Sequence, residues 1–416
     1  MKMEEWKEVS LKDITQLVID YRGKTPLKLG GEWSDSGYRA LSAKNVKTGI
    51  IVAEESIRYV DEDLYRKWMK DEVQRGDILI TSEAPFGEVF FWNSDEKIVL
   101  SQRLFDVRIK EDVCAQYVYY YMISHPFQAE LRSRASGTTV LGLKQPELLK
   151  SKVVLPDYDT QKKIAAQLSE IDDKIAVNRR ICENLEAQAQ ALFKHWFIDF
   201  APFKNGKFVE SELGMIPEGW RVGTFSEIFD LGPGGTPKTS EKAFWKDGTI
   251  PFFSPKDVNG VYCFETEKHI TEEGLNNCSS RLYDKNTVFI TCRGTVGKVA
   301  MAATPMAMNQ SNYAILSNKG YSQYFAYLMT VSIIKKLKFK ANGAVFDAIT
   351  TKDFKEQIII PNLSIVNRFD SFIQPIFDSI LNAGFENLRL STLRDTLLPK
   401  LMSGQIIVNE IEKSNI

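Results

Sequence analysis

The triplet Gly23-Lys24-Thr25 suggests chemistry because it has the ending of a phosphate-binding loop. That loop also requires an earlier glycine, and the position it would occupy in this chain is taken by Val18. Pro26 follows the triplet and opposes the entry into a helix that the motif needs. The triplet therefore does not predict a nucleotide site.

Two other groupings of reactive side chains fall short of a catalytic pattern. Asp157, Asp172 and Lys174 loosely imitate the carboxylate and lysine set of a nuclease, but charged residues beside a helical seam are ordinarily solvated. The 3 histidines are widely separated, and none has a partner at metal-ligand or triad spacing. The chain also lacks the glycine-rich cofactor loop and the Asn-Pro-Pro-aromatic signature of adenine methyltransferases. We therefore expect no catalytic residue, metal or cofactor in this chain.

Basic side chains beside a glycine turn occur twice and suit contact with phosphate. The turn exposes backbone N–H groups while the cations supply charge. A purely structural interpretation, an exposed basic helix end followed by a C-cap glycine, fits the same residues. The residues for which we predict phosphate contacts are Arg132, Arg134, Thr138, Thr139, Lys338, Lys340 and Asn342.

Side chains that could read bases must be bidentate or amide-type and must lie on loops that can enter a groove. Each of them is equally interpretable as an ordinary polar residue of the surface. The candidates in the first half of the chain are Arg22, Lys24, Arg39, Lys44, Asn45, Gln102 and Arg103. The candidates in the second half are Lys238, Lys256, Arg293, Asn309, Gln310 and Asn312. Two aromatic stretches, at 117–121 and 324–327, are expected in helix cores instead.

Composition limits the class of protein. The 416 residues are 44% hydrophobic and 26% charged, enough to bury two cores. The formal net charge of −1 is lower than a lone DNA-binding protein usually carries, so any affinity for DNA would have to come from local basic patches. The 5 cysteines have no paired spacing, and no signal peptide or apolar membrane span is apparent. We therefore expect a cytoplasmic protein.

The segments that must position these candidate residues occur as two copies of one sequence pattern along the chain. One copy starts at Trp6 and the other at Trp220, and a period this long indicates duplicated domains rather than a solenoid. Three pairs of segments recur in the same order. Gly23-Lys24-Thr25-Pro26 matches Gly235-Thr236-Pro237, and Ser42-Ala43-Lys44-Asn45-Val46 matches Ser254-Pro255-Lys256-Asp257-Val258. Val153-Val154-Leu155-Pro156 matches Ile358-Ile359-Ile360-Pro361.

Each copy ends in a stretch with a heptad seam, which predicts a long helix. The first seam contains Ile164, Leu168, Ile171, Ile175, Asn178, Leu185 and Leu192. The second contains Ile373, Ile376, Ile380, Asn387, Leu390 and Leu397. One asparagine stands in each seam, where a polar side chain commonly fixes register. Pro375 predicts that the second helix starts or kinks there.

The two seams are expected to pair as an antiparallel coiled coil about 55 Å long. The alternative is that each helix packs only on its own domain. Antiparallel pairing would place the two domains at opposite ends of a dumbbell with a pseudo-twofold axis. Such an arrangement suits the reading of two DNA half-sites, separated by roughly 15 base pairs or fewer.

The chain resembles the specificity subunits of type I restriction-modification systems. The residues that carry the resemblance are Gln161-Lys162-Lys163-Ile164, Ile171-Asp172-Asp173-Lys174-Ile175, Leu192-Phe193-Lys194-His195-Trp196-Phe197, Ile216-Pro217-Glu218-Gly219-Trp220-Arg221 and Leu393-Arg394-Asp395-Thr396-Leu397-Leu398-Pro399-Lys400-Leu401-Met402-Ser403-Gly404. The resemblance implies two target-recognition domains on two helices that bind two methyltransferase subunits, joined by restriction and translocase subunits. S-adenosylmethionine, ATP and Mg would then belong to those partners. The second helix departs from the pattern, since it reads Ile365-Val366-Asn367-Arg368 where the first has Gln-Lys-Lys-Ile.

These observations predict a mixed α/β protein that is a non-catalytic, double-stranded DNA recognition subunit for a bipartite target. The expected segments are a first target-recognition domain at 1–158, a central helix at 159–199, a linker at 200–219, a second target-recognition domain at 220–362, and a helix and tail at 363–416. Two other classes stay open, a standalone diverged methyltransferase or endonuclease and a structural adaptor that binds proteins. The first predicts S-adenosylmethionine binding by the chain alone, and the second predicts no sequence-dependent DNA binding.

Overall fold

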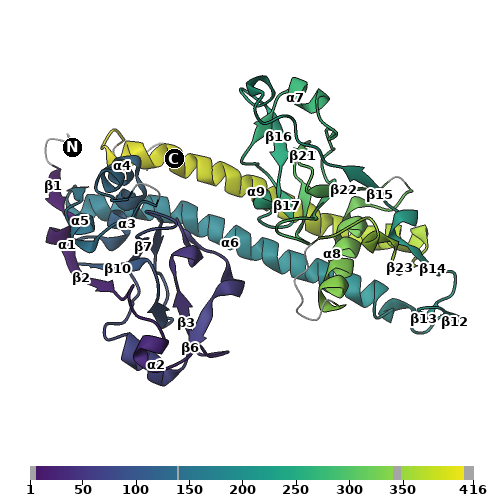
Figure 1. The fold of residues 1–416 in the computed structure, drawn as a ribbon, viewed down its shortest axis with the longest axis horizontal. Coiled ribbons are helices and arrows are strands. Elements are labelled where there is room, and N and C mark those ends of the chain that lie inside the picture. The colour runs from purple at the N-terminus through teal and green to yellow at the C-terminus, as the bar shows by residue number, and fades with distance from the viewer. Residues whose placement is uncertain (1–5, 138–139, 318, 341–347, 407–416) are drawn as a thin grey trace. The chain divides into compact units, whose positions relative to one another are not determined.

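A computed structural model describes residues 6–137, 140–317, 319–340 and 348–406. The chain divides into two compact units, one made of Met1–Asp173 with Leu390–Ile416 and the other of Lys174–Arg389. Both unit boundaries fall inside the two long helices, α6 (Tyr158–Phe197) and α9 (Leu363–Met402). Each long helix therefore contributes to both units (Figure 1).

The first unit is built on an antiparallel four-stranded sheet in the order β2-β10-β7-β8. Its strands are β2 (Thr15–Asp20), β10 (Leu104–Ile109), β7 (Ile78–Thr81) and β8 (Val89–Phe91). A three-stranded sheet in the order β6-β3-β9 comprises β6 (Arg58–Val60), β3 (Tyr38–Leu41) and β9 (Ile98–Leu100), and β3 and β9 are parallel. Two pairs of strands complete the unit, β1 (Lys7–Ser10) with β11 (Lys152–Leu155) and β4 (Val46–Lys47) with β5 (Ile50–Ile51).

Alternation along β10 explains why the four-stranded sheet is buried on both faces. Phe105 and Val107 pack in one core with α3 (Ala115–Ile123) and α4 (His125–Ser133), while Leu104 packs in another core with the three-stranded sheet. The tyrosines of α3 lie in the first of these cores, as expected. The remaining helices of the unit are α1 (Leu11–Ile14), α2 (Glu62–Trp68) and α5 (Gln145–Leu149).

The second unit repeats this strand order. Its larger sheet runs β15-β22-β19-β20-β17, and its three-stranded sheet runs β18-β16-β21 with β16 and β21 parallel. The strands are β14 (Arg221–Thr224), β15 (Asp230–Pro233), β16 (Ile250–Phe253), β17 (Tyr262–Cys263), β18 (His269–Ile270), β19 (Val288–Thr291), β20 (Val299–Ala302), β21 (Ala307–Met308), β22 (Asn312–Leu316) and β23 (Gln357–Ile360). The helices are α7 (Glu272–Asn276) and α8 (Gln323–Lys340). The duplication predicted from the landmarks is thus a duplication of topology.

One helix in the second unit stands where the first unit has two. α8 is continuous, whereas α3 and α4 are separated at Ser124, because Pro126 at the start of α4 lacks a backbone donor. The segment expected to be a linker, 200–219, contains a hairpin of β12 (Phe208–Ser211) and β13 (Gly214–Pro217). Gly214, with φ of 94°, supplies the left-handed residue at its turn, a conformation that glycine adopts at little cost.

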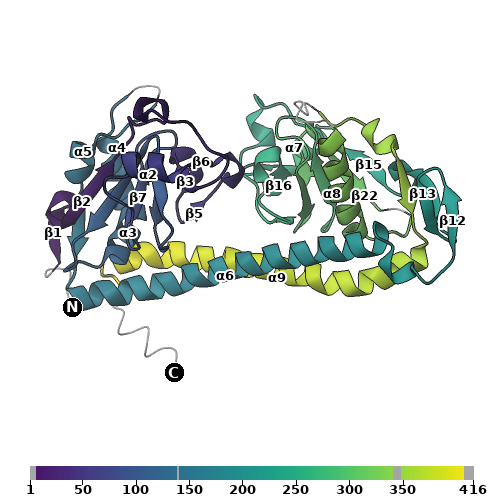
Figure 2. The same cartoon turned by 90° about the horizontal axis from the view of Figure 1, so that it is seen from below.

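The helix pairing is antiparallel within each unit. In the second unit the Asn178 amide donates to Asn387 Oδ1 at 2.9 Å, and Trp196 lies 5.6 Å from Phe369 between ring centroids. In the first unit Arg394 donates to Asp172 at 2.8 Å. Partner numbers fall along α9 as they rise along α6, and Figure 2 shows the helices side by side.

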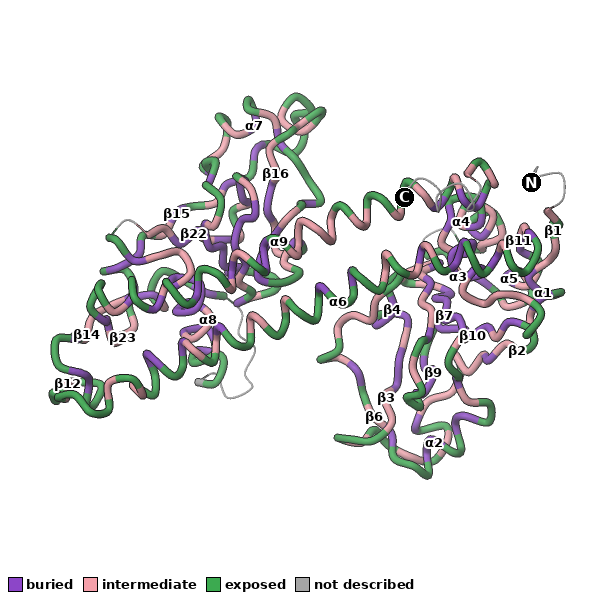
Figure 3. The backbone as a smooth tube through the Cα atoms, turned by 180° about the vertical axis from the view of Figure 1, so that it is seen from behind, coloured by how far each residue is buried: buried purple, intermediate pink, exposed green. Residues whose placement is uncertain are grey.

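Burial follows the predicted seam. The burial-coloured tube of α6 alternates along its length (Figure 3), and every predicted seam residue is buried or half-buried. The ends of the helices also enter the domain cores, since Ile164 and Leu168 share a core with Leu401 and Met402. The helices therefore pack on their domains as well as on each other. α9 begins well before Pro375, so the helix does not start at that proline.

Candidate nucleic-acid interface

A pocket of about 290 Å³ in the first unit brings together three of the predicted base-reading residues. Lys44, Gln102 and Arg103 line it from two different loops. Trp33 and Arg58 line it as well, and the sequence analysis missed both. The pocket is therefore a concave site with basic, amide and aromatic groups, the side-chain types that contact base edges and backbone.

Lys44 is held at the pocket by a capping box. Ser42 donates to Asn45 Oδ1 from its backbone at 3.2 Å and from its hydroxyl at 2.9 Å, which fixes a short 3₁₀ turn, 43–45. Lys44 is the exposed middle residue of that turn, and no carboxylate of the described residues pairs with it. The turn thus presents an unneutralised cation.

The prediction that Asn45 reads bases is wrong. Its side chain is 0% exposed, and its amide nitrogen lies within hydrogen-bond distance of the Val52 carbonyl (3.4 Å), the Ala53 carbonyl (3.3 Å) and the Ser56 hydroxyl (3.2 Å). Since its oxygen is taken by Ser42, no group of the amide is left for DNA. Asn45 positions the turn, and Asp257 does the same in the second unit by accepting from the backbone and hydroxyl of Ser254, both at 2.7 Å.

The loop between β9 and β10 carries Gln102 and Arg103. The Gln102 carbonyl accepts from the Ala43 N–H at 3.0 Å, which ties this loop to the Lys44 turn. Arg103 adopts φ of 63° and pairs with Glu83 at 3.0 Å, and the adjacent lining residue Ala84 has φ of 44°. Non-glycine residues in the left-handed region carry strain that tends to concentrate at functional sites. Two such residues line this pocket.

The other candidates of the first unit are tied up in internal contacts. Arg22 donates to Asp20 at 2.7 Å and lies 4.0 Å from the Phe105 ring centroid. Lys24 donates to the Trp68 carbonyl, and burial lowers its pKa. Arg39 pairs with Glu96 at 3.2 Å. These three side chains do not line the pocket, and each is engaged by another group of the protein.

In the second unit Lys256 and Gln310 occupy the places of Lys44 and Gln102. Lys256 is the exposed middle residue of the matching 3₁₀ turn and pairs with Glu267 at 3.7 Å. Gln310 is exposed in the loop before β22 and accepts a hydrogen bond from the Thr236 hydroxyl. Both keep part of their polar surface in solvent, so they stay candidates for base contact.

The remaining candidates of the second unit divide by exposure. Arg293 and Lys238 are exposed, and the described residues offer neither of them an ion-pair partner. Asn312 is only 2% exposed, and its amide donates to Asn309 Oδ1 at 2.7 Å. Asn309 also accepts from the Ser311 N–H at 3.0 Å, so its oxygen is used to shape the loop. Arg293 and Lys238 are thus the more accessible pair.

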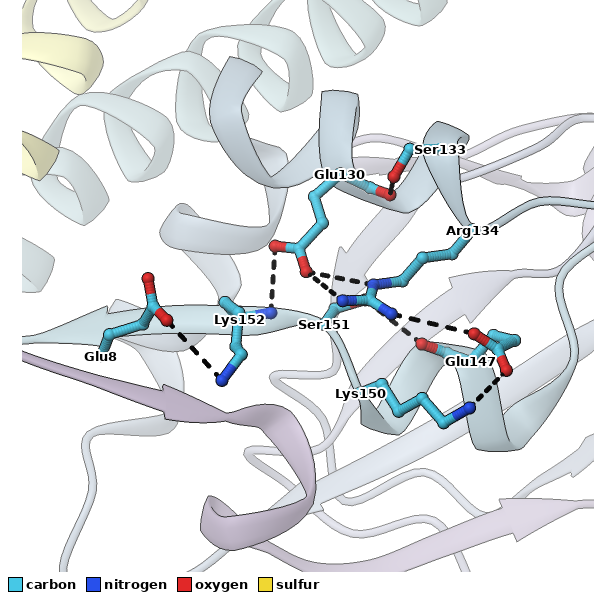
Figure 4. A network of polar contacts seen from close by, with 8 residues as sticks. All are labelled: Glu8, Glu130, Ser133, Arg134, Glu147, Lys150, Ser151 and Lys152. Carbon is cyan, nitrogen blue, oxygen red and sulfur yellow. Dashed lines mark hydrogen bonds and ion pairs between the residues drawn. The ribbon is translucent and has the colours of Figure 1, made fainter.

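The two arginines of the predicted phosphate patch in the first unit have different surroundings. Arg134 donates to Glu130 at 3.0 and 2.8 Å and lies 3.8 Å from Glu147 (Figure 4). Glu130 also accepts from the Lys152 N–H at 3.0 Å, so the network joins α4 to β11. Arg132 is exposed in the last turn of α4 and has no ion pair among the described residues. Of the two arginines, only Arg132 keeps its charge free of an ion pair among the described residues.

The matching patch of the second unit rests on Lys338. This residue is exposed near the end of α8 and lies beside Gly297. The predicted residues Thr138, Thr139 and Asn342 lie outside the described residues, as does the side chain of Lys340.

Among the described residues, no three His, Cys, Asp or Glu side chains gather in a way that could hold a metal ion. No helix within the same residues combines the length and apolarity needed to span a membrane.

Comparison with known proteins identifies one family. The model of the type I restriction modification DNA specificity domain matches residues 3–187 and again 217–383. The MjaIX type I restriction enzyme specificity subunit of Methanocaldococcus jannaschii is 28% identical, over 98% of this chain and 95% of that protein. The HindI specificity subunit of Haemophilus influenzae is 26% identical, over 97% and 100%. The crystal structure of a type I restriction-modification S subunit from M. genitalium has the same fold, with a TM-score of 0.51, 16% identity and coverage of 95% and 96%.

Proposed function

Since this chain belongs to the type I restriction modification DNA specificity family and recognises DNA in that role, we propose that each of its units reads one half of a bipartite target. The duplicated strand order gives both units the same scaffold. The loops on that scaffold differ in sequence, so the two half-sites are expected to be unlike. Bases between the half-sites would not be read.

The observation that carries this proposal is the pocket of the first unit. Lys44, Gln102 and Arg103 converge there, and Lys or Arg contacts to guanine and Gln contacts to adenine are the commonest ways to distinguish base pairs in the major groove. Lys256 and Gln310 stand at the same places in the second unit. Each unit thus has the same scaffold and carries its own lysine and glutamine, which supports separate recognition of bases by the two units.

Chemistry is proposed to lie in partner subunits. The sequence lacks the cofactor loop and the catalytic signature of adenine methyltransferases, and its relatives are named as specificity subunits of type I restriction enzymes. We therefore propose a non-catalytic cytoplasmic subunit that joins two methyltransferase subunits and, in the restriction complex, translocase and nuclease subunits. S-adenosylmethionine, ATP and Mg would be bound by those partners.

The test is adenine-methylation mapping with the methyltransferase partner and paired variants. Lys44→Ala/Gln102→Ala should relax base preference in one half-site only, with about 1–3 kcal/mol of discrimination lost for each base contact removed. Lys256→Ala/Gln310→Ala should relax the other half-site. Lys67→Ala, which removes an exposed charge on α2 away from the pocket, is the matched control and should change neither. Equal effects of both double variants on both half-sites would contradict the proposal.

Catalytic independence needs its own measurement. The purified chain is expected neither to bind S-adenosylmethionine nor to methylate DNA until the partner is added. Methyl transfer by the chain alone would show that it is an enzyme in its own right.

A further inference from the structure

A cation lies over a tryptophan ring at the pocket of the first unit. The Arg58 guanidinium carbon is 5.3 Å from the centroid of the Trp33 indole, and both side chains line the pocket. Trp33 is 37% exposed, a high fraction for a tryptophan, and its inner neighbour is Trp68 with ring centroids 6.2 Å apart. The indole therefore contacts both Trp68 and Arg58 and still keeps part of its surface in solvent.

The second unit contains the same arrangement in different residues. Lys268 Nζ lies 5.6 Å from the centroid of the Trp245 indole. Trp245 precedes β16 by the same number of residues as Trp33 precedes β3. The Trp245 ring nitrogen donates to the Lys238 carbonyl at 3.1 Å, which fixes the ring.

Strand register shows that the two cations are equivalent. Arg58 in β6 is the register partner of Ala40, the third residue of β3. The Lys268 carbonyl accepts from the N–H of Phe252, the third residue of β16, at 2.9 Å. The two domains therefore keep a positive charge and an indole at matched positions, although the identity of the cation has changed.

Neither cation is explained by a counter-ion within the protein. No carboxylate of the described residues lies within ion-pair distance of Arg58 or Lys268, whereas the neighbouring cations Arg39 and Lys256 both have such partners. A cation over an exposed ring contributes only about 0.5–1 kcal/mol to folding stability. This contribution alone does not account for two exposed and unpaired charges at matched positions. Both cations are thus oriented by a ring and free to meet an external anion.

We propose that the two cation–indole pairs are equivalent contacts to the DNA backbone. Arg58 and Lys268 each donate to a phosphate flanking the half-site that their unit reads, and the indole beneath packs on the sugar of the same nucleotide. Phosphate contacts fix register without carrying sequence information, which explains why the charge is kept in both units while the base-facing loops differ. This inference rests on the proposed DNA-reading function and adds the residues that hold the duplex.

The test uses the full complex with its methyltransferase partner and duplex DNA that carries the mapped target. Arg58→Gln and Lys268→Gln should each lower the slope of log affinity against log salt by about 0.9 and leave the methylated sequence unchanged. Arg58→Lys and Lys268→Arg keep the charge and should restore the slope. Trp33→Leu should weaken binding without a change in slope. Lys67→Ala should match the wild type, and thermal melting should show that every variant is folded.

The outcomes separate this inference from the proposed function. If the wild-type complex lacks sequence preference, the proposed function fails and this inference falls with it. If the wild type is specific and both Gln variants keep its salt slope, only the cation–indole contacts are refuted. A changed base preference with an unchanged slope would show base reading instead and would also overturn the inference. If a Gln variant melts early, the charge-keeping variant of the same site decides between the two roles. A slope restored to the wild-type value would support the phosphate contact. A slope equal to that of the Gln variant would show a purely structural role and overturn the inference.

Discussion

Arg132 and Arg134 lie close together in sequence, but substitution of each should have a different effect. One substitution should change DNA binding and the other should change stability. Arg134 is 26% exposed and makes two hydrogen bonds to Glu130, at 3.0 and 2.8 Å, so it belongs to the network that joins α4 to β11. Arg132 is exposed in the same helical turn and has no such partner among the described residues. The perturbation is the pair of single variants Arg132→Ala and Arg134→Ala.

For Arg134→Ala we expect a loss of stability without a change in DNA contact. Hydrogen bonds to charged groups contribute about 1.5–3 kcal/mol when buried, whereas exposed ion pairs contribute about 0.2–1 kcal/mol. A partly exposed pair lies between these ranges, so the expected loss is about 1–2 kcal/mol. Glu130 keeps the Lys152 N–H as a donor, which limits the loss.

For Arg132→Ala the expectation is reversed. An exposed residue without partners changes stability by no more than about 0.5 kcal/mol. Loss of one phosphate contact lowers the salt slope by about 0.9, so that raising salt from 50 to 200 mM weakens wild-type binding by about 3.5-fold more than it weakens the variant. Base preference should not change, since phosphate contacts position the duplex without specifying it.

The assay combines urea denaturation of each variant with fluorescence anisotropy titrations of target DNA at several salt concentrations. The reasoning is refuted if Arg134→Ala flattens the salt slope while its stability stays at the wild-type value. An Arg132→Ala protein with a wild-type slope would equally show that the exposed basic end of α4 does not touch DNA.

Three further outcomes follow from buried polar groups. Asn178→Leu should cost about 1–3 kcal/mol in urea denaturation because it strands the Asn387 oxygen, while adding Asn387→Leu should recover most of the loss; additive losses would contradict this. Asn45→Ala should lower the melting temperature without altering the methylated sequence, and a changed sequence would restore it as a base reader. Burial and the neighbouring Asp77 charge raise the pKa of Asp106, so its stabilising effect is present at low pH and is lost as pH rises through its folded pKa. Relative to the wild type, Asp106→Asn should gain stability as pH rises from the pKa of an unfolded carboxyl, about 4, to the raised folded pKa, by roughly 1.4 kcal/mol per pH unit, and the difference should level off above that folded pKa. A difference that stays constant from about pH 4 upward would refute the assignment.

The parts of the fold that sequence predicted are those coded by local periodicity. The heptad spacing of Ile164, Leu168 and Ile175 reports burial along one helix face, so both long helices could be located without coordinates. The segment at 200–219, expected to be a linker, contains a hairpin instead. Its hairpin depends on the pairing of Val209 with Ile216, a relation that helical periodicity does not reveal.

The residue type of a candidate can be read from the sequence, whereas its contacts within the protein cannot. Gln102 and Arg103 reach the pocket, but Arg22 and Arg39 are neutralised, the latter by Glu96, which lies far from it in sequence. The error at Asn45 was avoidable, since Ser followed three residues later by Asn or Asp resembles a capping box in both copies. The cation–indole pairs were missed because strand register, not sequence spacing, brings each cation to its ring.

One pair of matched loop positions is expected to contribute to the proposed difference between the two half-sites. β7 and β19 end at Thr81 and Thr291, whose hydroxyls each accept a backbone N–H at 2.9 Å, so the turns that follow them are closed by the same hydrogen bond. Beyond each threonine, at the same distance, stand Glu83 in the first unit and Arg293 in the second. A carboxylate accepts from the cytosine amino group, whereas a guanidinium donates to guanine. Glu83 is paired with Arg103 at 3.0 Å, whereas Arg293 has no ion-pair partner among the described residues, so the two turns present different groups to solvent. We therefore expect Glu83→Arg, which also releases Arg103, to change the preferred base in the half-site of the first unit alone. Methylation mapping of that variant is the measurement, and a change in both half-sites would contradict the assignment.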